Sequence, residues 1–560
     1  MSMIKVKNLQ KRYGTLAVIS DISFSIGRGE KVALVGHNGT GKTTLLKIMA
    51  GIEEPDAGVV EISRNACIGY LPQDSSLFGN ETISEYLRRI SGVDVIEEEL
   101  KKIAIDLSDS VIAERYSELH ETYERLEGYA FDRRMEITLS GFGLNNVGLN
   151  HKVSDLSSGQ KSKVALAGIL LKGVDVLLLD EPTNNLDLPA LIWLENFLQE
   201  TKATCIIVSH DRRFLDRVAK RVFELDWRTR TLNTTKGTYS DYLKMMRKRI
   251  MRQKEEYRLQ QEEISRLHEK AREKRVESAK GSRWIGSDND KFLRGFKRDR
   301  AGKSAKTAKV IEKRIERIDK IERPIERDLF KISLAAERGH GTLNIQLLNV
   351  VAGYLNGFKI GPISLDIRYG ERIGIMGLNG SGKSTLLKAI TGQLSVLEGK
   401  IEIGSGVRIG NMTQEHEALP RSSTLLSFIM ERTHISLQDS YAKLAKFGFN
   451  ESQVNLSINT LSPGGRARLL LALFSAQSVN ALVLDEPTNH LDIEASEALE
   501  ETIETYQGTI LIVSHDRFFL EKASLDETYI LSSGTLTRIP DYREYVKSAE
   551  ERAQKLLKLL

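Results

Sequence analysis

The chain has 560 residues, of which 41% are apolar and 28% are charged, and its formal net charge is +5. This length is too great for one hydrophobic core and predicts two domains, while the composition excludes a chain that is disordered throughout. The longest apolar run, residues 164–171, is far shorter than the roughly 20 residues of a membrane span. Because the N-terminus has no apolar signal core and the chain has only two cysteines, we expect a cytoplasmic protein.

The first motif along the chain is GHNGTGKT at residues 36–43, between an apolar strand at 31–35 and a helical stretch at 45–49. This context is that of a phosphate-binding loop, in which glycines let backbone N–H groups wrap the phosphates. Lys42 then reaches the terminal phosphates and Thr43 holds Mg²⁺. The motif recurs as GLNGSGKS at 377–384, where Lys383 and Ser384 take the same places. We therefore predict two nucleotide sites.

The spacing of the repeat changes along the chain, which locates an insertion. The two loops, Tyr13 with Tyr354, and Gln73 with Gln414 are separated by 341 residues, whereas all later matching motifs are separated by 305. The first half therefore holds 36 extra residues. Apolar residues at helical spacing favour a helical arm within about residues 85–150. The alternative is an enlarged version of a helical lobe that is already present.

An acidic pair follows an apolar strand in each half, at the edge of a parallel sheet where ligands bind. The strands 174–179 and 479–484 end in DEPTNNLD at 180–187 and DEPTNHLD at 485–492. We expect Asp180 and Asp485 to complete the metal shells. Glu181 and Glu486 would orient and deprotonate the attacking water, because phosphoryl transfer needs mainly positioning and charge stabilisation. The alternative for such a pair is a solvated helix cap.

A basic segment lies between the repeats, at residues 241–332. Residues 241–330 hold 28 Lys or Arg and 17 Asp or Glu, a net charge of +11, which favours a polyanionic partner. Two long helices are predicted, at 242–280 and at about 306–332, with Pro324 as the one breaker. Their apolar stripes would pair as an antiparallel hairpin, and they consist of Ile264, Leu267 and Ala271 on one helix and Ile311, Ile315, Ile318 and Ile321 on the other.

The predicted hairpin tip, about residues 281–305, combines cations with aromatic side chains. Residues 280–310 contain ten cations and three acids, so charge pairing within the segment cannot be complete. Aromatic rings among cations suit stacking on bases and contact with phosphates. For the helices, where acids alternate with bases, the solvated face of a coiled coil is the favoured interpretation. The candidate RNA contacts are Arg283, Trp284, Lys291, Phe292, Arg294, Phe296, Lys297, Arg298 and Arg300.

The motifs LSSGQ at 156–160 and LSPGG at 461–465, with the loops and acidic pairs, resemble the nucleotide-binding domain of ATP-binding cassette proteins, twice. The resemblance implies two cassettes, 1–240 and 333–560, that enclose two ATP–Mg²⁺ sites within one monomer. Each signature faces the other cassette's loop, and no transmembrane subunit is expected. The resemblance implies a first site made of Tyr13, Gly36, Asn38, Gly39, Gly41, Lys42, Thr43, Thr44, Gln73, Asp180, Glu181 and His210, closed by Ser462 and Gly464. It implies a second site made of Tyr354, Gly377, Asn379, Gly380, Gly382, Lys383, Ser384, Thr385, Gln414, Asp485, Glu486 and His515, closed by Ser157 and Gly159.

In these implied sites the tyrosines stack on adenine, the histidines assist the glutamates, and each metal is held by the loop hydroxyl, the glutamine and the aspartate. The second signature departs from the family pattern, because Pro463 has no N–H to donate and a fixed φ. Hydrolysis in the first site could therefore differ in rate or timing. Base choice rests on contacts that the sequence does not show, so GTP remains open as a substrate.

The whole chain resembles the ABC-F family: tandem cassettes, an arm in the first, and a charged helical hairpin between them. The resemblance implies an α/β fold and an ATPase that binds the ribosome when ATP is bound. Its hairpin would reach the P-site tRNA and the peptidyl-transferase centre, and hydrolysis would release it. A long aromatic tip favours ribosome protection against antibiotics over a housekeeping translation role. Two other classes are an ATPase subunit of a membrane exporter and a DNA-acting ATPase, and neither accounts for a basic hairpin between complete cassettes.

Overall fold

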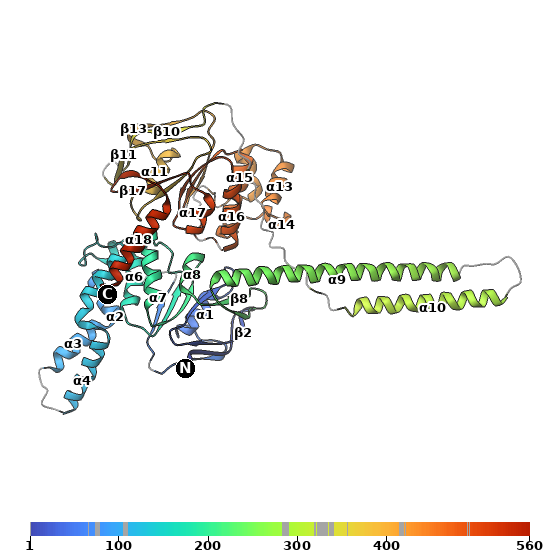
Figure 1. The fold of residues 1–560 in the computed structure, drawn as a ribbon, viewed down its shortest axis with the longest axis horizontal. Coiled ribbons are helices and arrows are strands. Elements are labelled where there is room, and N and C mark those ends of the chain that lie inside the picture. The colour runs from blue at the N-terminus through green and yellow to red at the C-terminus, as the bar shows by residue number, and fades with distance from the viewer. Residues whose placement is uncertain are drawn as a thin grey trace. The chain divides into compact units, whose positions relative to one another are not determined.

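The computed structural model describes residues 2–64, 66–72, 79–104, 110–282, 291–318, 321, 334, 341–354, 357–413, 419–420, 422–489, 491 and 493–560. The chain forms two compact units, one of Met1–Ser240 with Leu329–Leu560 and one of Asp241–Asp328. The first unit holds two α/β domains built on one plan, and the second is a helical hairpin (Figure 1). The tandem α/β architecture predicted from the sequence is confirmed.

The central sheet of the first domain has the strand order β5-β6-β7-β3-β8-β9, parallel except for β9 at one edge. Its strands are β3 (Lys31–Val35), β5 (Ile68–Leu71), β6 (Val176–Asp180), β7 (Thr204–Val208), β8 (Arg221–Leu225) and β9 (Leu232–Lys236). β6 and β7 are buried along their whole length, which explains their uninterrupted apolar sequences. The carboxyl ends of β3 and β6 meet at one edge, where a ligand site is expected.

A second sheet covers one side of this domain, with the antiparallel order β2-β1-β4. Its strands are β1 (Ser2–Tyr13), β2 (Leu16–Gly27) and β4 (Ala57–Ile62), and helix α1 (Lys42–Met49) leaves the loop after β3. A buried apolar cluster that includes Ile4, Leu34 and Leu45 joins the two sheets and α1. This core fixes the phosphate-binding loop between rigid elements.

The second domain repeats the same two sheets, with orders β14-β15-β16-β12-β17-β18 and β11-β10-β13. The strands are β10 (Ile345–Gly353), β11 (Lys359–Ile367), β12 (Arg372–Met376), β13 (Val396–Ile403), β14 (Ile409–Met412), β15 (Ala481–Asp485), β16 (Thr509–Val513), β17 (Glu527–Ser532) and β18 (Thr535–Ile539). Helix α11 (Lys383–Ile390) follows the second loop. The internal repeat of the sequence is therefore a repeat of structure, strand by strand.

Three further helices of each domain begin next to motif residues. They are α6 (Ser158–Leu171), α7 (Leu188–Glu200) and α8 (Arg212–Val218) in the first domain, and α15 (Pro463–Ala476), α16 (Ile493–Thr505) and α17 (Arg517–Ala523) in the second. Ser157, Asp187 and Asp211 cap the first three through side-chain oxygens that accept backbone N–H bonds. The caps place the motif side chains at helix N-termini that face the sheet edges.

The last helix of the chain, α18 (Tyr542–Leu557), packs against α7 of the first domain. Ala549 and Ala553 are buried in this contact, and Arg217 of α8 donates to the Glu550 carboxylate at 2.8 Å. Helix α18 therefore joins the two domains in addition to their facing edges.

The extra residues of the first domain form a helical arm, as predicted. The segment runs through α2 (Ile83–Ser91), α3 (Val93–Ile103), α4 (Ser110–Arg125), a short 3-10 turn η1 (Gly128–Ala130) and α5 (Phe131–Gly141). The second domain has only α12 (Leu425–Thr433), α13 (Leu437–Lys446) and α14 (Glu451–Val454) there among its described residues. α3 and α4 pack together, and Tyr123 Oη donates to Glu97 Oε1 at 2.7 Å.

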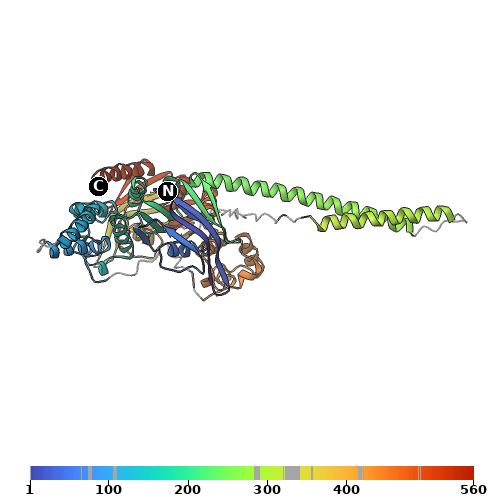
Figure 2. The same ribbon diagram turned by 90° about the horizontal axis from the view of Figure 1, so that it is seen from below.

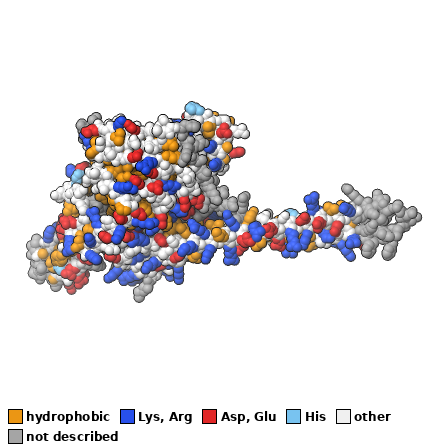
Figure 3. Space-filling view, turned by 45° about the horizontal axis from the view of Figure 1, so that its top comes forward, with side chains coloured by type: hydrophobic (Ala, Val, Ile, Leu, Met, Phe, Trp, Pro, Cys, Tyr) orange, Lys and Arg blue, Asp and Glu red, His pale blue; other side chains and the backbone are white. Residues whose placement is uncertain are grey.

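The second unit pairs α9 (Tyr239–Ser282) with α10 (Lys291–Glu316), which run side by side in both ribbon views (Figures 1 and 2). The pairing is antiparallel, because Arg275 bonds Glu312 at 2.8 Å while Arg314 bonds Glu263 at 3.4 Å. Lys and Arg side chains alternate with Asp and Glu along its visible face (Figure 3). In the part of the chain that the structure describes, no helix is long and apolar enough to cross a membrane.

The predicted start of the second hairpin helix was wrong. α10 begins at Lys291, about 15 residues before the predicted start, so much of the predicted tip of 281–305 is helical. Ala301 and Ala308 are buried in the hairpin, and this tertiary packing outweighs the low helix propensity of Gly302 between them. α10 ends at Glu316, where the N–H of Arg317 is shared between the carbonyls of the last turn, and the predicted end at 332 lies outside the described residues.

Candidate active site

Two phosphate-binding loops follow β3 and β12. Gly41 has a φ of 102° and a Cβ there would meet a β2 side chain at 2.4 Å, so the turn into α1 requires glycine. Lys42 Nζ donates to the carbonyls of Gly36 at 2.7 Å and His37 at 3.0 Å. Lys383 Nζ makes the matching bonds in the second loop, at 2.8 and 2.9 Å. Each ammonium is thus held beside a helix N-terminus, which favours an anion.

An aspartate and a hydroxyl face each other beside each loop. Thr43 lies beside Asp180 and Ser384 lies beside Asp485. Burial raises the pKa of both aspartates, and the hydroxyl beside each acts in the opposite direction. Asp180 Oδ2 is buried and accepts no hydrogen bond from any described residue. A hydroxyl and a free carboxylate oxygen fit Mg²⁺. Within the described ranges, no cluster of three His, Cys, Asp or Glu could hold a metal alone, so nucleotide phosphates would supply other ligands.

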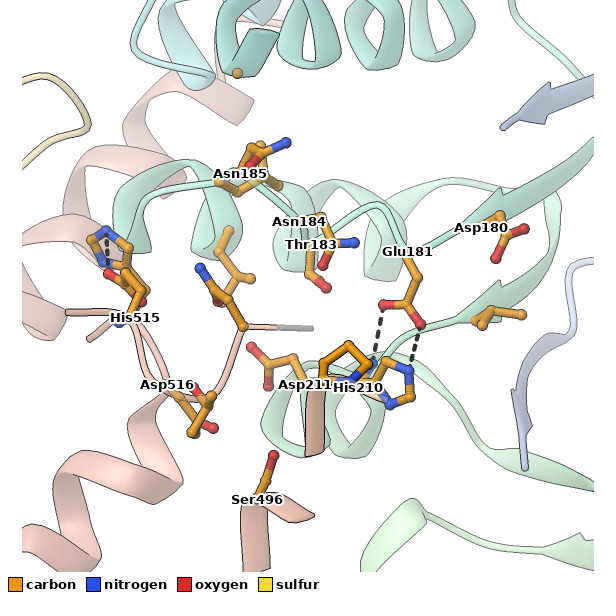
Figure 4. A pocket seen from close by; sticks show the side chains of 18 of the residues that line it. Asp180, Glu181, Thr183, Asn184, Asn185, His210, Asp211, Ser496, His515 and Asp516 are labelled. Carbon is orange, nitrogen blue, oxygen red and sulfur yellow. Dashed lines mark hydrogen bonds and ion pairs between the residues drawn. The ribbon is translucent and has the colours of Figure 1, made fainter. Parts of the chain in front are cut away.

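Glu181 is held beside His210 in the first site (Figure 4). The carboxylate lies 3.2 Å from His210 Nε2 and accepts the His210 backbone N–H at 3.3 Å. Its own N–H donates to Val208 O at 2.9 Å, and its φ is 52°, so the backbone is strained to aim the side chain. Burial raises the pKa of Glu181 to about 7. A carboxylate poised near neutral pH suits a general base.

The second site repeats this arrangement with deeper burial. Glu486 has a φ of 47° and accepts the His515 N–H at 3.2 Å. His515 Nε2 lies 3.4 Å from the Glu486 carboxylate, without hydrogen-bond alignment. Burial raises the pKa of Glu486 to about 8 and lowers that of His515 to about 3. At pH 7 both groups are therefore predominantly neutral in the protein alone, and their contact is not an ion pair.

The first domain contributes polar groups to the second site. Asp187 Oδ2 accepts the backbone N–H of Asn379 at 3.1 Å, and Asn379 Nδ2 donates to Asn185 O at 2.8 Å. Lys163 Nζ lies 3.0 Å from Asp187 Oδ2, and both side chains are buried. Burial acts to raise the pKa of Asp187, whereas nearby charges, chiefly the Lys163 ammonium, act to lower it. The net shift of this pKa is downward. The sequence reading did not identify Lys163, Asn185 or Asp187 as site residues.

One cavity of about 1040 Å³ is lined by residues of both predicted sites and of both cassettes. Gly159 and Pro463, at the starts of α6 and α15, line it. Ser157, Ser462 and Gly464 are not among its lining residues. The other predicted site residues that line the cavity are Tyr13, Asn38, Gly39, Gly41, Lys42, Thr43, Thr44, Asp180, Glu181, His210, Asn379, Gly380, Gly382, Lys383, Ser384, Thr385, Asp485, Glu486 and His515.

The two predicted base-stacking tyrosines differ. Tyr13 lines the cavity and its Oη donates to Glu53 at 2.5 Å. Tyr354 does not line the cavity and is 56% exposed, and Phe358 lines it instead. Phe358 follows Tyr354 by four residues and replaces the small Ala17 of the first domain in the repeat, which is a signal that the sequence offers. An aromatic face for a base is therefore present beside each loop.

Several predicted residues cannot be placed. Gln73, Gln414, Arg283 and Trp284 lie outside the described residues. The side chains of Lys291, Phe292, Arg294, Phe296, Lys297 and Arg298 are likewise not described, although their backbone belongs to α10. Arg300 is exposed on α10.

The family model described as "ABC transporter" matches residues 19–184 and 360–489. The chain is 31% identical to ABC transporter F family member 5 of Arabidopsis thaliana, over 99% of this chain and 79% of that protein. It is 33% identical to the tylosin resistance ATP-binding protein TlrC of Streptomyces fradiae, over 92% and 95%. It also resembles the archaeal ABCE1 chain in a complex with a ribosomal stalk protein, with 20% identity, a TM-score of 0.54 and coverage of 93% and 87%.

These matches and the paired cassettes define the class: the chain is an ATP hydrolase with two ATP-binding cassettes in tandem. Within that class it belongs to the ABC-F family.

Proposed function

We propose that this chain is a cytoplasmic ABC-F ATPase that binds the ribosome in its ATP-bound state and leaves on hydrolysis. Its hairpin lies near the P-site tRNA and the peptidyl-transferase centre, where it contacts ribosomal RNA. The proposal rests on the family and on the charge of the hairpin, because residues 241–330 have a net charge of +11.

The observation that supports the proposal most strongly is the exposure of the cations on α10. Arg300 and the hairpin lysine set (Lys303, Lys306 and Lys309) are exposed, and Asp299 is the one acid between residues 291 and 311. Charges on the middle of α9, by contrast, pair locally, as where Arg258 bonds Glu255 at 2.7 Å. A row of cations with few neighbouring acids binds nucleic acid favourably, because contact with the phosphates releases their condensed counterions.

The two sites would hydrolyse ATP by positioning and electrostatics. In their ionised forms Glu181 and Glu486 accept a proton from the attacking water, and each carboxylate is oriented by the backbone N–H of the histidine beside it. Lys42 and Lys383 turn from the loop carbonyls to the terminal phosphates and neutralise charge there.

Mg²⁺ held by Thr43 and Asp180, or by Ser384 and Asp485, with the two glutamines, would neutralise phosphate charge at each site. In the first site Pro463 stands at the start of α15, where the family has a glycine. That helix N-terminus offers one N–H fewer, so we propose that the first site turns over more slowly than the second.

For the biological role we propose protection of the ribosome against an antibiotic. A relative over nearly the whole chain, TlrC, is named a tylosin resistance ATP-binding protein. Expression of the chain in a susceptible host should then raise the inhibitory concentration of at least one ribosome-targeting drug. A housekeeping translation role predicts no change for any of them.

The experiment that tests ribosome binding is sedimentation of the Glu181→Gln, Glu486→Gln double variant with purified ribosomes. ATP should bring the variant into the ribosome pellet, because ATP binds but is not hydrolysed. ADP should not. A second variant that also carries Gln at the hairpin lysine set should pellet less at the same ATP occupancy.

Absence of ATP-dependent pelleting, with ATP binding intact, would reject the ribosomal proposal and favour another polyanion. Equal pelleting with and without the hairpin lysine set would retain the ribosome as partner and reject the hairpin as its contact. A binding assay with fluorescent ATP is the control for both variants.

A further inference from the structure

Two buried ion pairs join the cassettes, and the internal repeat relates them. Arg212 at the start of α8 bonds Glu500 of α16 in the other cassette. Arg517 at the start of α17 bonds Glu195 of α7. Both arginines and both glutamates are separated by the repeat offset of 305 residues. The second pair is therefore the pseudo-twofold copy of the first.

The geometry of both pairs is specific. Arg517 uses both terminal nitrogens, with Nη1 at 3.2 Å from Glu195 Oε2 and Nη2 on Oε1. Arg212 also approaches Glu497 at 3.5 Å. The four paired side chains are between 0 and 8% exposed. A two-pronged arginine–carboxylate contact fixes direction as well as distance.

Each arginine lies two residues after the histidine that contacts the site glutamate of its own cassette. His210 and His515 are followed by Asp211 and Asp516, which cap the same short helices that the arginines begin. Both aspartates lie on the turns that line the cavity (Figure 4). A shift of either arginine therefore moves the turn that presents the histidine to its glutamate.

Each glutamate lies on a helix that reaches toward the arginine's own site. Glu195 belongs to α7, whose cap Asp187 accepts the N–H of Asn379 in the second phosphate-binding loop. Arg517 and His515 belong to that second site. The Arg517–Glu195 pair thus closes a ring around it, through α7, the loop and the histidine turn. Arg212 and Glu500 occupy the matching positions around the first site.

The two ion pairs fix the register in which the cassettes meet more than they strengthen the contact. Removing a buried ion pair from water costs about as much as the attraction returns, whereas burying one partner without the other is strongly destabilising. A closed arrangement in any other register would leave Arg212, Arg517 and Glu500 buried without these partners, while Glu195 would keep only Arg217 of its own cassette, at 3.0 Å. Only one closed arrangement therefore satisfies both pairs together.

We propose that Arg212 with Glu500, and Arg517 with Glu195, are positioning residues for ATP hydrolysis. They set the register of cassette closure and hold each histidine turn in place for the chemical step. The proposal concerns ATP hydrolysis by the chain alone, so its outcome is independent of ribosome binding.

The test is a charge exchange at the more buried pair, with Arg517→Glu, Glu195→Arg and the double variant. All three, and their reference protein, also carry Arg217→Gln, because an arginine at 195 would otherwise face Arg217, which lies 3.0 Å from Glu195. Each single variant should lower the steady-state kcat at least tenfold, while the affinity for fluorescent ATP stays within twofold. The double variant should recover at least threefold of that loss. The matched control is Arg213→Glu, which breaks the neighbouring but exposed cross-cassette pair with Glu521 and should change kcat less than twofold.

A parent-like kcat in both single variants would overturn the proposal, as would folded single variants whose defect the exchange does not relieve. If the charge-reversed variants do not fold, Arg517→Lys decides. It keeps the charge but loses the two-pronged contact, and should lower kcat at least threefold at unchanged KM. Parent-like kcat in this variant would overturn the proposal equally.

Discussion

Glu486→Gln should make the nucleotide-free protein more stable, and increasingly so as pH rises. The folded protein raises the pKa of Glu486 from 4.5 to about 8, chiefly by burial. The folded state therefore keeps this proton over a range in which the unfolded state has lost it. Below pH 4.5 the burial of Glu486 costs the parent no free energy of unfolding, because both states are protonated. The cost grows as pH rises toward about 8.

The magnitude follows from the pKa difference. One pH unit within this window is about 1.4 kcal/mol, so the parent forfeits about 3 kcal/mol at pH 7. Glutamine cannot titrate and has the shape of the protonated acid. The difference in free energy of unfolding between variant and parent should thus widen by about 1.4 kcal/mol per unit between pH 5.5 and 7.5.

Urea unfolding of both proteins without nucleotide, at half-unit steps across this range, measures the difference. Glu551→Gln, at an exposed position of α18, controls for the loss of one negative charge. A difference that stays constant with pH, or narrows as pH rises, would refute the assignment of a buried, protonated Glu486.

Two further predictions concern other charges. Lys163→Met leaves the buried Asp187 carboxylate without its ammonium, so it should lower the free energy of unfolding in urea by about 3 kcal/mol. The control, Lys152→Met at an exposed position, should change this free energy by less than about 0.5 kcal/mol. Equal effects of the two substitutions would show that burial of the pair does not matter. Gln at the hairpin lysine set should reduce the slope of log affinity for ribosomes against log salt by about 2, and an unchanged slope would mean that these lysines do not contact phosphates.

The parts of the site that the sequence predicts are those written in contiguous residues. A loop such as GHNGTGKT specifies its own turn, helix start and lysine position, so its chemistry can be read without the fold. The acidic pairs are equally local, because each follows a strand end. The arm could be located because the spacing between matched residues of the two halves changes along the chain.

The parts that the sequence did not predict depend on partners far along the chain. Asp187 reaches Asn379, and Arg517 reaches Glu195, only after both cassettes have folded and met. The start of α10 was missed for a related reason. Glycines marked a loop by propensity, but burial of Ala301 against the hairpin decided the outcome.

The place of α18 has a consequence for synthesis. This helix follows the second cassette in the chain, yet it covers α7 of the first cassette, and Ala549 and Ala553 line a small cavity with the buried Trp193. Throughout translation of the second cassette, the first has an uncovered apolar face on α7. The nascent chain therefore completes the surface of the first cassette only after the whole second cassette has been made, and a product stalled or truncated before α18 would keep that face open to chaperones and to aggregation.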